Sequence, residues 1–150
     1  MEYIVEEGKL IKCVPSVPEQ IIEHDGVRVK IQTQELDLII PEGVESISLK
    51  AFDTVKSYVE TISLPASIKT LEGCQIKPLL NLKRIVINGE IKIVPHGFFS
   101  GLKELKSVEF SNPVNTIEES AFSKCKSLEQ VNFSEGLERI EKYAFLNVIN

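Results

Sequence analysis

The side chains that most often carry chemistry are few in this sequence, and they lie far apart. Three cysteines, Cys13, Cys74 and Cys125, show none of the close spacing that metal sites use. Two histidines, His24 and His96, have no neighbour at ligand spacing and are predicted to lie in turns or at the surface. We therefore expect three buried thiols that pack as small apolar groups, and neither a metal site nor a cofactor site.

Acidic residues are numerous but spread along the chain. Pairs such as Glu118 and Glu119 resemble solvated residues at the start of a helix, not a matched acid and base with different pKa values. The sequence contains no glycine-rich phosphate loop, zinc-protease helix, nucleophile elbow or calcium loop. Asn132-Phe133-Ser134 matches a glycosylation triplet but falls inside an expected strand. We expect no catalytic residues and no enzyme activity.

The composition indicates one folded domain. The chain has 150 residues, of which 43% are apolar and 26% charged, which suffices for a buried core. A net charge of -5 without a basic block predicts no binding to nucleic acid or anionic lipid. No apolar run approaches the roughly 18 residues of a membrane helix, and the acidic N-terminus does not resemble a signal peptide. We therefore expect no insertion into a membrane.

Most of the chain repeats itself every 23 residues. Six positions of the repeat are apolar in every unit, a regularity far above the 43% apolar content of the chain. In the unit that starts at Leu105 these positions are Val108, Phe110, Val114, Ile117, Phe122 and Cys125. The five units span residues 35–58, 59–81, 82–104, 105–127 and 128–150, and the first is one residue longer than the others.

Each unit shows the pattern of a strand, a tight turn, a short second extended stretch and a helical turn. The alternation in Ser107-Val108-Glu109-Phe110 predicts a strand with one buried face. Turn-forming residues such as Asn88-Gly89 follow the strand. Later in the unit, Ala121, Phe122 and Cys125 fall at helical spacing.

One unit cannot bury its own apolar positions, so neighbouring units are expected to stack. Equivalent strands of successive units then pair in parallel. The predicted fold is an α/β repeat solenoid, a stack of about five coils with a parallel sheet on one side and short helical turns that close each coil.

The repeat resembles the BspA-like subgroup of the leucine-rich repeats. Its opening, Leu105-x-x-Val108-x-Phe110, is similar to that of leucine-rich repeats, and Ile117-x-x-x-Ala121-Phe122-x-x-Cys125 is similar to the tail of the subgroup. The Asn ladder of many leucine-rich repeats is absent. The resemblance covers residues 35–150 and weakens where other residues replace the subgroup pattern, at Gln75, Ile76, Pro78 and Pro95.

The resemblance implies a non-catalytic module that binds a protein, because such repeats are similar to modules of bacterial and protozoan surface proteins that bind host or partner proteins. It places the chain at the cell surface, or among secreted proteins, if a leader has been removed. A complete chain that begins at Met1 is instead expected in the cytoplasm.

The two ends of the chain differ. Residues 1–34 do not fit the repeat, and the strand signals in 3–14 together with Asp25-Gly26 between apolar alternations predict a β-hairpin cap over the first coil. The C-terminal end shows no equivalent cover for Ile140, Phe145 and Val148. That end predicts either a homodimer formed end to end or a segment of a longer protein.

Two functional hypotheses follow. The first is a protein-binding module whose contacts lie in the two outward columns of the parallel sheet, with Ile39, Arg84 and Val86 as first candidates for anchors. The second is a structural or assembly protein, or a fragment of a longer surface protein, that associates through its C-terminal coil. The partner-binding columns of the first hypothesis are Asp37, Thr61, Arg84, Ser107 and Gln130, and Ile39, Ser63, Val86, Glu109 and Asn132.

Overall fold

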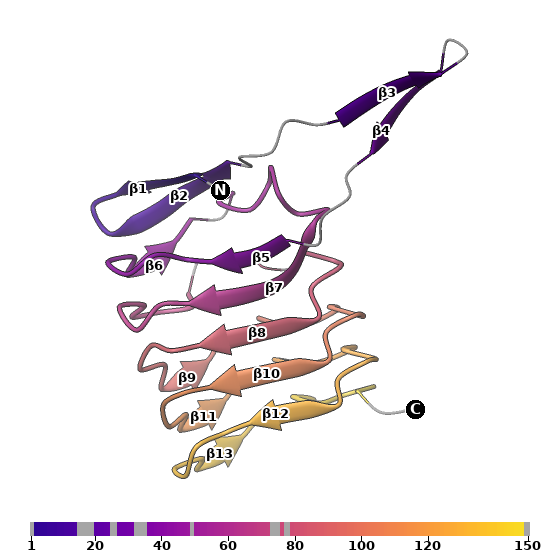
Figure 1. Cartoon of the computed structure of the whole chain (residues 1–150). Coiled ribbons are helices and arrows are strands. Elements are labelled where there is room, and N and C mark those ends of the chain that lie inside the picture. The colour runs from indigo at the N-terminus through magenta and orange to yellow at the C-terminus, as the bar shows by residue number, and fades with distance from the viewer. Residues whose placement is uncertain are drawn as a thin grey trace.

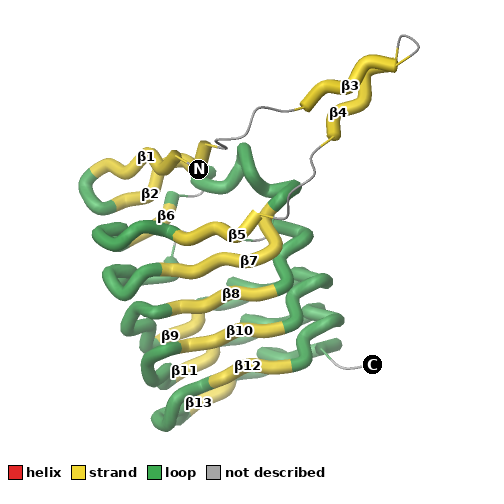
Figure 2. Tube along the Cα trace, viewed as in Figure 1, coloured by secondary structure: helices red, strands yellow, loops and turns green. Residues whose placement is uncertain are grey.

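The chain folds into a β-solenoid (Figures 1 and 2). The computed structural model describes residues 2–14, 20–24, 27–31, 36–48, 50–72, 76 and 79–148. Thirteen strands occur in these ranges, and none of their residues belongs to a helix. The strands are β1 (Glu2–Glu6), β2 (Lys9–Val14), β3 (Gln20–His24), β4 (Val27–Ile31), β5 (Leu36–Ile39), β6 (Ser46–Ile47), β7 (Val59–Leu64), β8 (Arg84–Ile87), β9 (Ile93–Val94), β10 (Ser107–Phe110), β11 (Thr116–Ile117), β12 (Gln130–Asn132) and β13 (Arg139–Ile140).

A parallel sheet runs along one side of the solenoid, as the repeat predicted. Its strand order is β12-β10-β8-β7-β5, and all neighbours pair in parallel. We call it the main sheet. Ile62 pairs with Ile85, which pairs with Val108, so each step along the sheet advances by one repeat unit in sequence. The step between β5 and β7 is one residue longer and carries a bulge between Leu36 and Asp37.

The core is a ladder of apolar side chains inside the coils. The inward positions of the main sheet, such as Ile62, Ile85 and Val108, are nearly inaccessible to solvent. On the opposite side of the coils, the rings of Phe99 and Phe122 stack with their centroids 4.7 Å apart. Phe145 continues this stack, 5.0 Å from Phe122. Aromatic stacking between coils thus adds to the burial of apolar area.

The expectation of short helical turns is not met in the described residues, which form successive tight turns instead. In residues 120–125, N–H groups bond alternately to carbonyls of the next coil and to carbonyls within the same turn. An α-helix needs every N–H to point along its own segment, so this alternation excludes it. The N–H groups that reach the next coil belong to Ser120, Phe122 and Lys124, and their acceptors are the carbonyls of Lys142, Ala144 and Leu146.

Backbone conformation explains how the turns alternate. Ser120 and Lys124 both have positive φ, 58° and 63°, and glycines occupy the equivalent positions one coil earlier, at Gly97 and Gly101. Residues with positive φ interrupt a right-handed helix and turn their N–H groups outward. The helical spacing of Ala121, Phe122 and Cys125 therefore correctly predicted that these residues are buried, but they lie in turns and not in a helix.

A second set of short strands lies behind the main sheet and is interrupted. β9, β11 and β13 form one parallel sheet, whereas β6 belongs to a different sheet, in which it pairs with β2. Residues 70–72, between these two groups, form no strand. Where the sheet is intact, the N–H of Glu118 donates to the carbonyl of Val94 at 3.0 Å. Pro95 occupies the equivalent position one coil earlier and has no N–H, so the corresponding bond to Leu71 cannot form, and the N–H of Glu72 bonds to the hydroxyl of Thr70 within its own coil.

The N-terminal residues form two antiparallel hairpins. β1 pairs with β2, and β2 continues in parallel onto β6, so that Leu10 and Cys13 join the core. β3 pairs with β4 in a separate sheet, while Asp25 and Gly26 of the expected turn lie outside the described residues. The role of residues 1–34 as a cap and the limits of the repeat units remain predictions.

Candidate interaction surface

The ten residues predicted to face solvent on the main sheet all lie in or beside its strands, and none of them is buried. Successive side chains of a strand alternate between core and solvent, so the buried columns force these columns outward. Ile39 stands out because its side chain is 68% exposed, whereas the other residues of its type on the main sheet are buried. The alternation thus produces a continuous solvent face with one conspicuous apolar residue at the β5 end.

A hollow of about 190 Å³ lies on this face, over β5, β7 and β8. It forms because the outward residues of β7, Thr61 and Ser63, are short, whereas longer side chains border them on both neighbouring strands. The structure brings six of the ten predicted residues together here. The hollow is lined by Asp37, Leu38, Ile39, Thr61, Ile62, Ser63, Arg84 and Val86.

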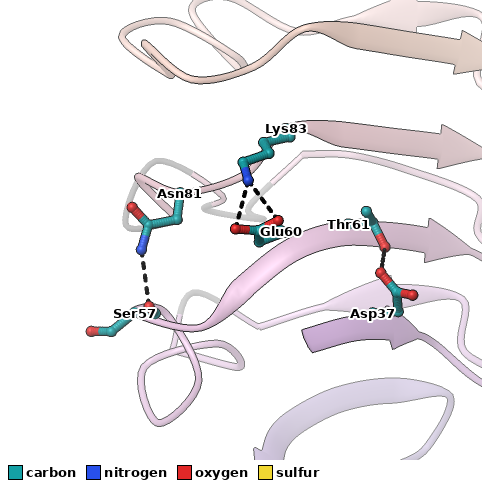
Figure 3. A network of polar contacts seen from close by, with 6 residues as sticks. All are labelled: Asp37, Ser57, Glu60, Thr61, Asn81 and Lys83. Carbon is teal, nitrogen blue, oxygen red and sulfur yellow. Dashed lines mark hydrogen bonds and ion pairs between the residues drawn. The ribbon is translucent and has the colours of Figure 1, made fainter. Parts of the chain in front are cut away.

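The charged groups around the hollow are unequally engaged. The Thr61 hydroxyl donates a hydrogen bond to the Asp37 carboxylate (Figure 3). Glu60 precedes Thr61 in β7, and Lys83 directly precedes β8. The Lys83 ammonium contacts both carboxylate oxygens of Glu60 at 2.7 Å. Arg84 makes no hydrogen bond or ion pair through its side chain anywhere in the described part of the chain. Within that part of the chain, its guanidinium is available to an anion from outside.

The other four predicted residues lie farther along the main sheet and do not line the hollow. Ser107 and Glu109 belong to β10, and Gln130 and Asn132 to β12. The Gln130 amide donates to the Asn132 side-chain oxygen at 2.8 Å, so these two side chains partly satisfy each other. The predicted residues on this half of the face are polar.

Tyr3 lies in β1, outside the repeats, and the repeat pattern did not point to it. Burial raises the pKa of the Tyr3 hydroxyl, as does the nearby Cys13, while a backbone hydrogen bond from Ile39 acts in the opposite direction. Tyr3 is partly buried and packs against the hydrophobic core. Because Tyr3 precedes the repeats, no periodic signal could have placed it against the core.

Several acids have a different role from the one their positions suggested. The Glu118 carboxylate accepts a hydrogen bond from the N–H of His96, one coil earlier, at 2.8 Å. Glu141 does the same for the N–H of Glu119, at 3.2 Å. These carboxylates bind the backbone of the preceding coil and do not start helices. The recurrence of an acid at the same position of both units was the signal that could have revealed it.

A polar ladder follows the main sheet at its turns. Asn88 donates to the carbonyl of Leu64, and its side-chain oxygen accepts a hydrogen bond from Ser111 at 2.8 Å. The Asn112 amide in turn donates to the backbone oxygen of Asn88. The Asn ladder of many leucine-rich repeats lies in the buried corner column, which is apolar in this chain, whereas these side chains lie in the turn before that column.

The thiols offer no reactive centre in the described residues. Burial raises the pKa of Cys13 to about 12 and that of Cys125 to about 11, so both are protonated at neutral pH. The Cys125 thiol donates to the carbonyl of Phe99 at 3.0 Å. Cys74 lies outside the described residues. Among the residues described, no group of three His, Cys, Asp or Glu side chains is placed to hold a metal ion.

The three residues predicted for end-to-end contact differ in exposure. Ile140 is 53% exposed, Phe145 is partly buried against the core, and Val148 is only 8% exposed. Leu146, which the prediction did not include, is 44% exposed. Together with Tyr143, which is 59% exposed, Ile140 and Leu146 are the large exposed hydrophobic residues of the last coil.

Comparison with known proteins places this architecture among repeat proteins. A family model described as BspA type leucine rich repeat region matches residues 32–150 in six copies, one more than the five units counted from residue 35. A leucine-rich repeat protein from Bacteroides ovatus has a similar fold, with a TM-score of 0.55 at 22% identity over 74% of this chain and 34% of that one. The transcription elongation factor SPT6 of Debaryomyces hansenii is 38% identical over 52 residues, 35% of this chain and 4% of that protein.

No helix long and apolar enough to cross a bilayer occurs in the described part of the chain.

Proposed function

Because the chain belongs to the BspA-type leucine-rich repeat family, we propose that it is a non-catalytic module that binds a partner protein through the solvent face of the main sheet. Repeats of this family typically serve in protein interaction. The observation that carries the proposal is the hollow over β5, β7 and β8, where the exposed Ile39, the guanidinium of Arg84 and Val86 surround two short side chains. Aromatic or aliphatic anchors and arginines are the side chains that contribute most to protein interfaces.

A capture experiment with matched variants tests this proposal. The double variant Arg84→Ala, Val86→Ser removes both features of the hollow from β8 without touching the core. Its control, Ile93→Ser with Arg139→Ala, removes an exposed apolar residue and an arginine from the second set of strands. We expect proteins from the source cell to be retained by the wild-type chain and the control and lost with the double variant.

Thermal unfolding of both variants checks that the fold persists. Surface substitutions of this kind change the free energy of unfolding by about 0.5 kcal/mol or less. Equal capture by the double variant and the wild type, with both folded, would exclude this face as the binding surface.

A second candidate is association through the C-terminal coil, which the exposure of Ile140 and Leu146 favours. Apolar surface left exposed in a folded chain often marks a site of contact between protein chains. Under this proposal, Ile140→Lys converts an oligomer into a monomer, whereas Ile93→Lys, a change at a similarly exposed isoleucine, leaves its mass unchanged. Sedimentation of the wild-type chain and both variants decides the matter, and a monomeric wild type over a wide concentration range contradicts it.

A further inference from the structure

We propose that the hollow over β5, β7 and β8 accepts an apolar side chain of the partner together with an adjacent carboxylate, and that Arg84 binds this carboxylate. The inference rests on the proposed function, because it assumes that the main sheet is the binding face. It adds the chemistry of the segment that the partner presents.

The size of the hollow favours a side chain over a small-molecule ligand. Its volume of about 190 Å³ lies below the roughly 300–1,000 Å³ of sites that enclose cofactors and drug-sized ligands. The floor is formed by the short side chains of Thr61 and Ser63, between Ile39 and Val86 on the neighbouring strands. An apolar side chain placed there would cover Ile39, which is 68% exposed in the free chain.

The charges around the hollow favour a carboxylate at its β8 side. Arg84 has no anionic partner within the described residues, whereas the nearby carboxylates of Asp37 and Glu60 are bonded to Thr61 and Lys83. Glu109, on the next strand of the same face, is exposed and forms no ion pair with Arg84. The planar guanidinium can bind both oxygens of a carboxylate at once.

A basic side chain beside Arg84 would meet its like charge, because the acidic Asp37 lies two strands away on β5. The proposed segment therefore combines an acidic residue with an aliphatic or aromatic neighbour. Asp37 is the acidic residue that lines the hollow, so its negative charge disfavours the partner's carboxylate on the β5 side.

Selection from a library of short random displayed peptides tests the inference. The full chain, the variant Arg84→Glu and the control Arg139→Glu are used as separate targets. From the wild type and the control we expect peptides with Asp or Glu beside Leu, Ile or Phe, and from Arg84→Glu peptides enriched in Lys or Arg. Synthetic peptides selected on the wild type should bind at least about tenfold more weakly to Arg84→Glu and unchanged to Arg139→Glu.

Two measurements locate the peptides and sharpen the result. Binding should shift the backbone amide signals of Ile39, Thr61, Ser63 and Val86. Asp37→Asn, which removes the negative charge from the hollow and keeps an oxygen for Thr61, should bind the acidic peptides more tightly. Thermal unfolding confirms that each variant is folded.

The outcomes separate this inference from the proposed function. Peptides that shift the signals of the main sheet but show no acidic enrichment overturn the inference and leave the proposed function intact. Peptides that shift only residues of β9, β11 and β13 overturn both. An equal loss of affinity in Arg84→Glu and Arg139→Glu, or no peptide selected on the wild type, also overturns the inference.

Discussion

The main sheet and the second set of strands arise from the same repeat, yet only the main sheet passes through every unit. The main sheet joins β5, β7, β8, β10 and β12 without a gap. On the second side, the strands stop after β6 and resume at β9, leaving a hollow of about 210 Å³ beside Leu71, Ile91 and Pro95. Only a few backbone hydrogen bonds per coil hold the second side together, so each lost donor weakens it more than a lost donor weakens the main sheet.

This difference shows how much redundancy each side has. The main-sheet strands have three to six residues. The strands of the second side, β6, β9, β11 and β13, have two residues each. In the main sheet, one altered position leaves several ladder bonds intact. The second side depends on specific residues, notably a non-proline residue at the position of Glu118 and Glu141.

The largest expected effect comes from the core that both sides share. Phe122 is fully buried and stacks on Phe99 and Phe145. Phe122→Ala should lower the free energy of unfolding by about 3–5 kcal/mol, because it removes both stacks and leaves a cavity. Chemical denaturation measures this. Phe145→Ala, at a partly buried ring with one stacking neighbour, should cost clearly less, and equal costs would contradict a ladder that extends from coil to coil.

A smaller effect is expected where the two coils at the gap approach each other. A Cβ at Gly89 would overlap the backbone oxygen of Ile68, so Gly89→Ala must push these coils apart. We expect a loss of about 1–3 kcal/mol in the free energy of unfolding. Gly101→Ala is the control: its Cβ would meet open space, and its cost of about 1 kcal/mol reflects only the positive φ of 84°. A larger loss in the free energy of unfolding for Gly101→Ala than for Gly89→Ala would contradict the importance of the close contact at Gly89.

The gap itself can be reproduced elsewhere in the solenoid. Glu118→Pro removes the N–H that pairs with Val94 and the carboxylate that pairs with His96, as Pro95 does one coil earlier. The backbone at this position accepts proline, since Pro95 already occupies its equivalent. We expect a loss of about 2 kcal/mol, because a carbonyl is left without its partner. Amide hydrogen exchange should then quicken in β9, β11 and β13 and stay slow in β8 and β10.

Glu118→Gln is the matched control for this break. It keeps the backbone N–H and an acceptor oxygen for His96, so its cost should stay below about 1 kcal/mol. Faster exchange in the main sheet of Glu118→Pro would show that the two sides are not independent.

The smallest expected effect is a pH dependence from the buried thiols. Burial raises the pKa of Cys125 to about 11, above its ordinary value of 9.0, so the folded chain holds this proton when the unfolded chain has lost it. The resulting stabilisation is full below about pH 9 and declines as the pH rises toward 11. Denaturation under reducing conditions at pH 7 and pH 10 should show a larger loss for the wild type than for Cys125→Ala. Equal losses would contradict this role of burial.

Much of the architecture could be read from the apolar columns. The column that contains Ile85 and Val108 is apolar in every unit. That regularity predicted stacked coils, a parallel sheet and the outward direction of the alternate side chains. The same regularity placed Ile39, Arg84 and Val86 on one face. Local alternation suffices for this because a strand has only two faces.

The sequence by itself therefore determined the repeat, the core and the membership of the solvent face. Tertiary structure decided the rest. Whether Ala121 and Phe122 form a helix depends on N–H groups that bond to the next coil, and these partners lie in the following repeat unit. The hollow beside Arg84 depends on the relative lengths of side chains on three adjacent strands. Both are properties of neighbours in space, which a periodic pattern along one chain does not contain.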